Sequence, residues 1–244
     1  MPPLEVLGVR VDDATYDLLL ERVDAFVASG APHQIVTLNP EMLVRAHDDR
    51  ALRRVLNGAD LNVADGTGIM LAARLLGHPL PERVTGSDGI YRLAAHCAAR
   101  GYRLYLLGAG PGVAEAAAGR LVDLYPGLTV AGTDAASPRP EDEDEIVARV
   151  RAAAPHLLLV AYGVPAEELW IARNGPRLGV PVMVGVGGAF DFVAGVTRRA
   201  PPWMRRLGLE WLHRLLRQPW RWRRQLALLR FLGLVLAQQL RQKA

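Results

Sequence analysis

Asp65 is the clearest candidate for acid–base chemistry in the chain. It ends the run DLNVAD at 60–65 and is followed by Gly66-Thr67-Gly68, whose small residues leave room for a ligand. A carboxylate at the carboxyl end of a strand is placed to accept a proton from a substrate hydroxyl. An aspartate in this position is also a common cap of the helix that follows. The spacing by itself is consistent with either role.

Glycine-containing and polar segments also follow other runs of β-forming residues. Small residues let backbone N–H groups approach a phosphate, and a following helix adds the positive end of its dipole. Together these segments predict a nucleotide or sugar-nucleotide site. They are TLNP (37–40), GAGPG (108–112), YGVP (162–165) and GVGGAFD (185–191).

The segment at 108–112 partly matches the dinucleotide fingerprint G-x-G-x-x-G. Val113 occupies the place of the third glycine, and the acid expected at the end of the next strand is missing there, since Asp134 comes later. A tight turn near a phosphate or substrate therefore fits this segment better than a nicotinamide site. A nucleotide-dependent oxidoreductase is the alternative enzyme.

Asp142-Glu143-Asp144 has the D-x-D spacing of a metal–diphosphate site. The motif sits within the acidic run EDEDE after Pro140, where carboxylates stabilise the start of a helix, and it does not follow a buried strand. The six histidines lack metal-ligand spacing. We therefore expect no metal and no cofactor. The single cysteine, Cys97, excludes an intramolecular disulfide and favours a reducing, cytoplasmic compartment.

Strand and helix patterns alternate over the first 195 residues. QIVTL (34–38) is a strand pattern, Pro40 opens a helical stretch to about Asn57, and Ser87 is expected to cap a helix over 88–100. This alternation predicts an α/β fold with a largely parallel, Rossmann-like sheet and helices on both faces. Ligands bind outside the carboxyl ends of the strands in such sheets.

The net charge of +4 is the average of two very different parts. From Arg198 to Ala244 there are 12 Lys and Arg and one acid, Glu210, which leaves 17 bases and 24 acids for the preceding residues. We therefore expect two domains, an α/β catalytic body over 1–195 and a basic, helical appendage over 196–244 that associates with a membrane.

Three roles are open for this appendage: binding a membrane surface, binding nucleic acid, and forming an ordinary solvated tail. Its bases flank apolar helical stripes such as Trp211, Leu212, Leu215 and Leu216, which favours the membrane surface over nucleic acid. The apolar run at 226–237 contains Arg230 and is shorter than the ~20 residues that spanning requires. A non-enzymatic membrane- or nucleic-acid-binding adaptor is the alternative to an enzyme.

Several ordered motifs together resemble the WecG/TagA/CpsF family of bacterial glycosyltransferases. The resemblance implies an inverting, metal-independent hexosyltransferase that moves an N-acetylmannosamine-type sugar from a UDP donor to polyprenyl-diphosphate-linked N-acetylglucosamine. It places the enzyme on the inner face of the cell membrane, in the synthesis of teichoic acid or exopolysaccharide, and leaves a homo-oligomer open. The motifs are TLNPEML (37–43), ADLNVADGTGI (59–69), ERVTGSD (82–88), VAYGVPAEELW (160–170), GVGGAFDFVAG (185–195) and the segment 199–225.

The resemblance also assigns roles to individual residues. It implies that Asp65 is the general base, with Thr37, Asn39 and Arg83 beside it in the substrate pocket. It places Gly163, Gly187, Gly188 and Asp191 on the nucleotide side. It implies that arginines of the appendage reach over the site, where they compensate the charge of the departing diphosphate. These arginines are Arg214, Arg221 and Arg224.

Glu167 departs from the family pattern G-x-P-x-Q-E, because it stands where a glutamine is usual in Gly163-Val164-Pro165-Ala166-Glu167-Glu168. A glutamine amide can donate a hydrogen bond to a sugar oxygen, whereas an ionised glutamate can only accept one. We therefore expect Glu167 to bind substrate and to select a different donor or acceptor sugar.

Overall fold

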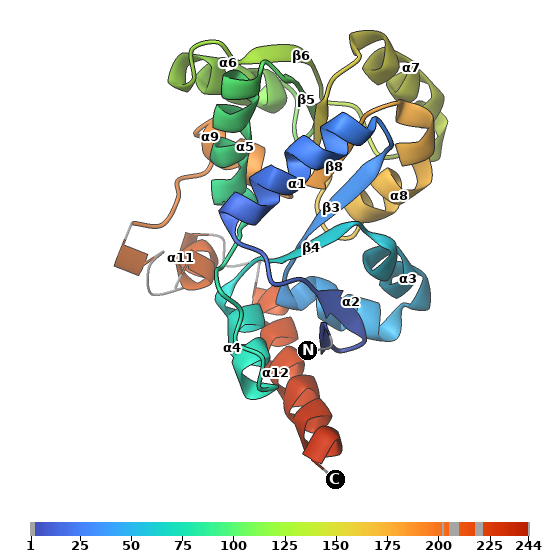
Figure 1. Cartoon of the computed structure of the whole chain (residues 1–244). Coiled ribbons are helices and arrows are strands. Elements are labelled where there is room, and N and C mark those ends of the chain that lie inside the picture. Colours follow the sequence, from blue (N-terminus) through green and yellow to red (C-terminus); the bar gives the residue numbers. More distant parts are fainter. Residues whose placement is uncertain (1–2, 202, 205–209, 218–221, 244) are drawn as a thin grey trace.

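A computed structural model describes residues 3–201, 203–204, 210–217 and 222–243 (Figure 1). Its centre is a six-stranded sheet in the order β4-β3-β8-β7-β5-β6, in which every neighbouring pair is parallel. The predicted α/β class is confirmed. The strands are β3 (His33–Leu38), β4 (Leu61–Ala64), β5 (Arg103–Gly108), β6 (Thr129–Asp134), β7 (Leu157–Ala161) and β8 (Val182–Gly185), and β1 (Leu4–Val6) and β2 (Val9–Val11) form a separate antiparallel hairpin.

Helices cover both faces of the sheet because its central strands are apolar on both sides. In β7, Leu157 and Leu159 belong to the core on one face, and Leu158 and Val160 to the core on the other. Successive side chains point to opposite faces, and both faces are buried here. The sequence of such a strand is therefore a continuous run of apolar residues. The first core includes α1 (Tyr16–Ser29), α5 (Gly86–Arg100), α6 (Val113–Leu124) and α9 (Ala189–Val193), and the second includes α7 (Glu143–Ala153), which follows the short helix η1 (Pro140–Asp142), and α8 (Ala166–Leu178).

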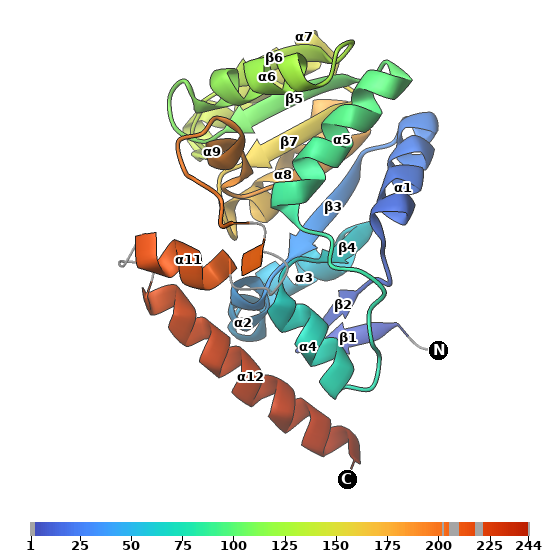
Figure 2. The same ribbon diagram turned by 90° about the vertical axis from the view of Figure 1, so that its left-hand side faces the viewer.

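A third apolar core joins the long C-terminal helix α12 (Trp222–Lys243) to the body. Phe231 and Val235 are both 0% exposed and lie in one cluster with residues of β1, β2 and the helices that follow β3 and β4. Figure 2 shows α12 running along α2 and α4 at the lower edge of the molecule. These helices are α2 (Pro40–Asp48), α3 (Arg50–Gly58) and α4 (Thr67–Leu75), and the shorter α11 (Glu210–Arg217) precedes α12.

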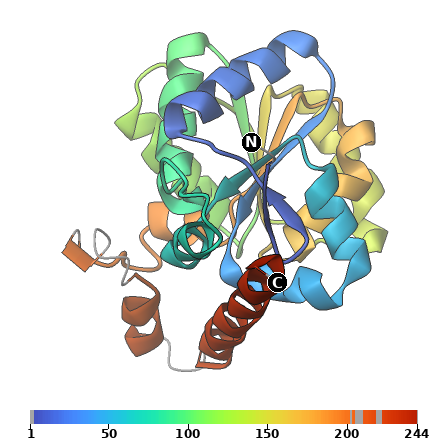
Figure 3. The ribbon, with the colours of Figure 1, turned by 60° about the horizontal axis from the view of Figure 1, so that its bottom comes forward.

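Polar contacts hold α12 along its length. The Arg230 guanidinium pairs with both carboxylate oxygens of Asp48 at 2.7 and 2.8 Å. The Gln238 side chain accepts from the Leu7 amide and donates to the Glu5 carbonyl, both at 2.8 Å, which links the helix to the hairpin. In Figure 3 the C-terminal end of α12, marked C, projects toward the viewer.

The outer face of α12 is apolar as well. Its exposed leucines recur at helical spacing on the side away from the buried Phe231, and Leu229 is 68% exposed. Within the described ranges, no helix combines the length and hydropathy needed to traverse a bilayer. These exposed leucines are Leu226, Leu229, Leu236 and Leu240, and we call them the outer leucine stripe.

Three expected element boundaries are wrong. The strand after residues 108–112 is β6, which ends at Asp134, so this acid does stand at the strand end where none was expected. The stretch from Pro40 is two helices, because the Asp49 side chain accepts from the amides of Ala51 and Leu52 and so caps a new helix. Ser87 does not cap the next helix. Thr85 does, since its hydroxyl accepts from the Asp88 amide and the helix begins at Gly86.

Replacing Phe231 by alanine should lower the free energy of unfolding by about 3–5 kcal/mol, because the change leaves a cavity where α12 meets the body. Urea unfolding measures this. Leu229→Ala on the same helix is the matched control and should change stability by less than about 0.5 kcal/mol. Equal effects of the two variants would show that α12 does not pack on the body.

Candidate functional site

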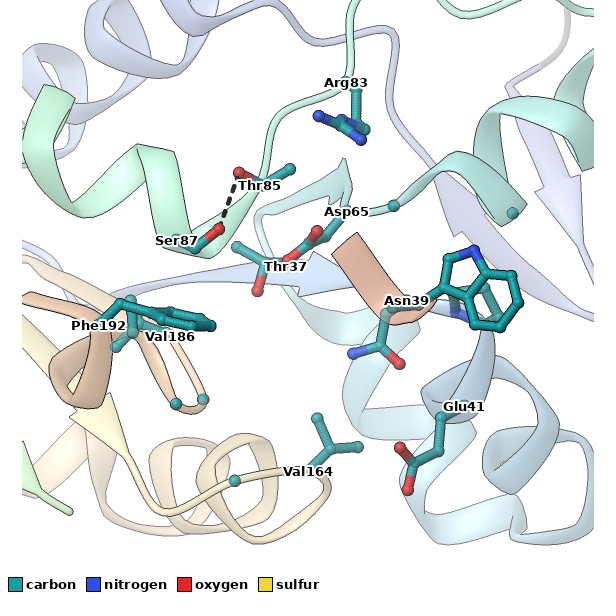
Figure 4. A pocket seen from close by; sticks show the side chains of 18 of the residues that line it. Thr37, Asn39, Glu41, Asp65, Arg83, Thr85, Ser87, Val164, Val186 and Phe192 are labelled. Carbon is teal, nitrogen blue, oxygen red and sulfur yellow. Dashed lines mark hydrogen bonds between the residues drawn. The ribbon is translucent and has the colours of Figure 1, made fainter. Parts of the chain in front are cut away.

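A cavity of about 400 Å³ opens at the carboxyl ends of the central strands (Figure 4). Nine of the twelve predicted site residues line it, although they come from five separate stretches of the chain. This convergence follows from the parallel sheet, which brings the loops after its strands to one edge. The nine are Thr37, Asn39, Asp65, Arg83, Gly163, Glu167, Gly187, Gly188 and Asp191.

The carboxylate of Asp65 does not cap the helix that follows it. The N-cap of α4 is Gly66, which has no side chain to offer, and Asp65 Oδ2 accepts from the Gly86 amide at 3.1 Å. The Asp65 amide donates to the Leu38 carbonyl at 2.7 Å, so both its backbone and its side chain are tied to neighbouring segments. The helix-cap interpretation is therefore wrong, and the carboxylate is held at the wall of the cavity.

Thr37 and Asn39 lie on either side of the end of β3. The Thr37 hydroxyl donates to the Gly185 carbonyl at 3.1 Å, which joins β3 to β8 beside the cavity. Asn39 is the N-cap of α2, and its Oδ1 accepts from the Met42 amide at 3.0 Å. In Figure 4 the side chains of Thr37 and Asp65 lie at the centre of the view, with Arg83 on the loop above them.

The start of α5 forms a second wall of the cavity. Thr85 is buried and caps the helix, and its hydroxyl lies 3.4 Å from that of Ser87. Arg199 donates to Asp88 at 2.6 Å and to the Ser87 hydroxyl at 3.2 Å, which fixes the chain after α9 against this wall. The motif ERVTGSD therefore supplies several lining residues, of which Arg83 alone was predicted.

The loops after β7 and β8 form the opposite wall. Gly163 and Gly187 have φ of +77° and +52°, a left-handed conformation that favours glycine, and the amide of each points to the Glu167 side chain. Gly188 is the N-cap of α9, and Asp191 lies in the first turn of that helix. The Asp191 carbonyl accepts from the Thr197 amide at 3.0 Å.

Glu167 and Glu168 form a pair of buried carboxyl groups at the start of α8, 1% and 0% exposed. Burial raises the pKa of Glu167 to about 7, although the N–H groups of Gly163 and Gly187 that donate to it lower this pKa. Burial also raises the pKa of Glu168 well above its ordinary value, and the Glu167 carboxylate raises it further. The pair therefore holds protons at pH values where exposed glutamates are ionised.

The C-terminal segment contributes to the cavity through residues that the motifs did not single out for the site. Trp211 of α11 and Leu228 of α12 both line it. Arg214 and Arg224 lie in these two helices, but their side chains are outside the described part of the structure, as is the whole of Arg221. The signal that could have found Leu228 is the amphipathic pattern of α12, whose inner face packs toward α2 and α4.

The D-x-D and GAGPG motifs lie elsewhere. Asp144 pairs with Arg177 at 2.5 Å, and Glu143 forms an ion pair with Arg173. Neither these acids nor residues 108–112 belong to the described lining of the cavity. Over the described ranges, no group of three or more His, Cys, Asp or Glu is arranged to hold a metal ion.

Comparison with known proteins gives consistent matches over most of the chain. The model of the glycosyl transferase WecG/TagA/CpsF family matches residues 4–244. The N-acetylglucosaminyldiphosphoundecaprenol N-acetyl-beta-D-mannosaminyltransferase of Bacillus subtilis (strain 168) is 32% identical over 209 residues, which cover 86% of this chain and 81% of that protein. The enzyme of the same name from Staphylococcus aureus (strain NCTC 8325) is 33% identical over 216 residues, covering 87% and 84%.

Replacing Glu168 by glutamine should reduce the amount by which the free energy of unfolding falls as the pH rises. Because its folded pKa is raised, the stabilisation from its protonated form is present below about pH 4.5 and is lost as the pH rises through the folded pKa. One extra proton in the folded state corresponds to about 1.4 kcal/mol per pH unit, or roughly 3–5 °C in melting temperature. As the pH rises above about 4.5, the melting temperature of the parent should fall more steeply than that of the variant, by about this amount per pH unit until the folded carboxyl group ionises. Thermal melts over a pH series measure this, and parallel curves would contradict the buried, protonated state of Glu168.

Proposed function

The chain belongs to the WecG/TagA/CpsF family and is a glycosyltransferase, and on that basis we propose which sugar it moves and how. The proposed reaction transfers an N-acetylmannosamine-type sugar from a UDP donor to polyprenyl-diphosphate-linked N-acetylglucosamine. The names of the relatives support this acceptor and this sugar. The observation that carries the mechanism is the placement of Asp65, whose carboxylate lies at the cavity and does not cap α4.

In this proposal Asp65 is the general base of an inverting displacement. The acceptor hydroxyl oxygen attacks the anomeric carbon from the face opposite UDP and forms the new glycosidic bond. The bond from that carbon to the diphosphate oxygen breaks, UDP takes the electron pair, and the hydroxyl proton passes to Asp65. The hydrogen bond from the Gly86 amide at 3.1 Å orients the carboxylate for this transfer.

The donor is proposed to bind between the loops after β3, β7 and β8. Glycines at 163, 187 and 188 leave the backbone of the two last loops accessible, and Asp191, Asn39 and Thr37 add polar groups. Arg83 supplies positive charge from the opposite wall, and Arg214, Arg221 and Arg224 are proposed to add more from the C-terminal segment. Arginine stabilises a departing diphosphate by charge-assisted, bidentate hydrogen bonds, so the reaction is proposed to need no metal.

The C-terminal segment is proposed to dock the enzyme on the inner face of the cell membrane. The outer leucine stripe presents apolar side chains, and α12 contains five bases and no acid. Leucines that enter the interface and bases that approach anionic headgroups both favour binding. Because Leu228 of the same helix lines the cavity, docking would bring the site to its lipid-linked acceptor.

The transfer activity is tested by UDP release from a panel of UDP-N-acetylhexosamines with a prenyl-diphosphate-linked N-acetylglucosamine analogue. We expect release that depends on the acceptor and persists in chelator. Asp65→Asn should lower kcat about 100-fold to 10,000-fold, because a general base contributes about this factor, and should leave UDP binding near normal.

The matched control is Asp60→Asn, at the opposite end of strand β4, where the carboxylate pairs with His33 at 2.9 Å. This variant should keep its activity. Loss of UDP binding in Asp65→Asn, or turnover close to that of the parent, would contradict the role of Asp65. Absence of acceptor-dependent release with every donor would contradict the proposed reaction.

Membrane docking is tested by sedimentation with vesicles that contain anionic phospholipid. Replacing Leu229, Leu236 and Leu240 together by alanine should lower the bound fraction, with a partition coefficient reduced at least about tenfold by the lost apolar burial. Leu124→Ala is the control, because Leu124 is 57% exposed on α6, away from the appendage. Equal binding by the triple variant and the parent would exclude the outer leucine stripe as the docking surface.

A further inference from the structure

The carboxylate of Glu167 bridges two loops that form one wall of the cavity. Its Oε2 accepts from the Gly163 amide at 2.9 Å and from the Gly187 amide at 3.0 Å, and its Oε1 also lies 3.0 Å from the Gly187 amide. Gly163 belongs to the loop after β7 and Gly187 to the loop after β8. One side chain therefore supplies the acceptor for both loop amides.

The packing around this carboxylate leaves it little freedom to turn toward a ligand. Glu167 is 1% exposed, and a Cβ added to Gly185 would lie 3.0 Å from its Cγ. Such a contact is tighter than most real Cβ contacts, so the Glu167 side chain would have to shift if position 185 carried a side chain. The neighbouring Glu168 lies against the same glycine, with Oε1 3.1 Å from that added Cβ.

Glu168 differs from its neighbour although it is just as buried. Neither of its carboxyl oxygens has a hydrogen-bond partner among the described residues, and the Gly163 and Gly187 amides donate to Glu167. An isolated ionised carboxylate is costly to bury, whereas three short contacts to N–H groups compensate part of that cost for Glu167. The two carboxyl groups thus differ in what they contact: Glu167 accepts from both loop amides, and Glu168 does not.

We infer that Glu167 is a positioning residue for the UDP-sugar donor, which holds the loops after β7 and β8 at the spacing that the donor requires, and is not itself a ligand of the sugar. This inference rests on the proposed function, because it takes the cavity to be the donor site. It also changes what a glutamine at this position would do. A single amide oxygen in the place of Oε2 can accept from both loop amides, while the NH2 group in the place of Oε1 cannot accept from Gly187. Glu167→Gln therefore keeps the two bridging hydrogen bonds through one oxygen, loses the third contact and leaves the choice of sugar unaltered.

The test compares Glu167→Met, Glu167→Gln and Glu168→Gln in the full chain. Methionine fills a similar volume but provides no oxygen acceptor for the loop amides. Amide hydrogen exchange, followed residue by residue by NMR without any ligand, should speed up at Gly163 and Gly187 by about tenfold in Glu167→Met and remain near the parent rate in the other two variants.

Donor binding gives the second readout. Calorimetry with UDP should show a dissociation constant raised by about tenfold in Glu167→Met and restored to within about threefold in Glu167→Gln. In turnover, KM for the donor should rise more than kcat falls, because the loops act on binding. The preference among UDP-N-acetylhexosamines should be the same in Glu167→Gln and the parent.

Two outcomes would overturn the inference. Unchanged exchange at both glycine amides in Glu167→Met would show that no bridge exists, and a new donor preference in Glu167→Gln would make Glu167 a direct ligand of the sugar. If Glu167→Met does not fold, the donor preference of Glu167→Gln still tests whether Glu167 is a direct ligand of the sugar. Failure of the parent to bind UDP would contradict the proposed function alone, since the exchange measurements use no nucleotide.

Discussion

The parallel direction of all six sheet strands is the constraint on which the site depends. Parallel strands need crossover connections, so the loop after each strand reaches the same edge of the sheet and leads into a helix. Asp65, Gly163 and Gly187 follow three different strands, yet they line one cavity for this reason. The burial of both sheet faces then leaves this edge as the place where polar loop groups line the cavity.

The C-terminal helix has two apolar faces with different consequences. Its inner face contains Phe231 and Val235, which complete the core around α2, while Leu228 extends the same face to the cavity. Its outer face contains the outer leucine stripe. One helix therefore carries both the outer leucine stripe and a residue of the cavity wall. The polar contacts of Gln238 and Arg230 hold this helix against the body.

Two buried carboxyl groups, of which Glu167 lines the cavity, lie at the start of α8. Glu167 has backbone donors and Glu168 has none among the described residues, so equal burial has unequal effects on the two groups. Burying such a pair costs stability that apolar residues of similar volume would not cost. The bridging of two loops beside the cavity is the contribution that offsets this cost.

Local patterns in the sequence determined the fold class, the strand ends and most of the lining residues. Strand and helix periodicities are local, and a parallel sheet leaves one arrangement for the residues that follow its strands. The sequence could not show whether the Asp65 carboxylate caps α4, because one group that donates to it, the Gly86 amide, lies 21 residues away. It also predicted a substrate contact for Glu167, whose hydrogen bonds in the fold go to Gly163 and Gly187. Only the tertiary structure decided these partners, and the place of Leu228 in the cavity wall, because hydrogen bonds and packing join segments whose separation no local pattern encodes.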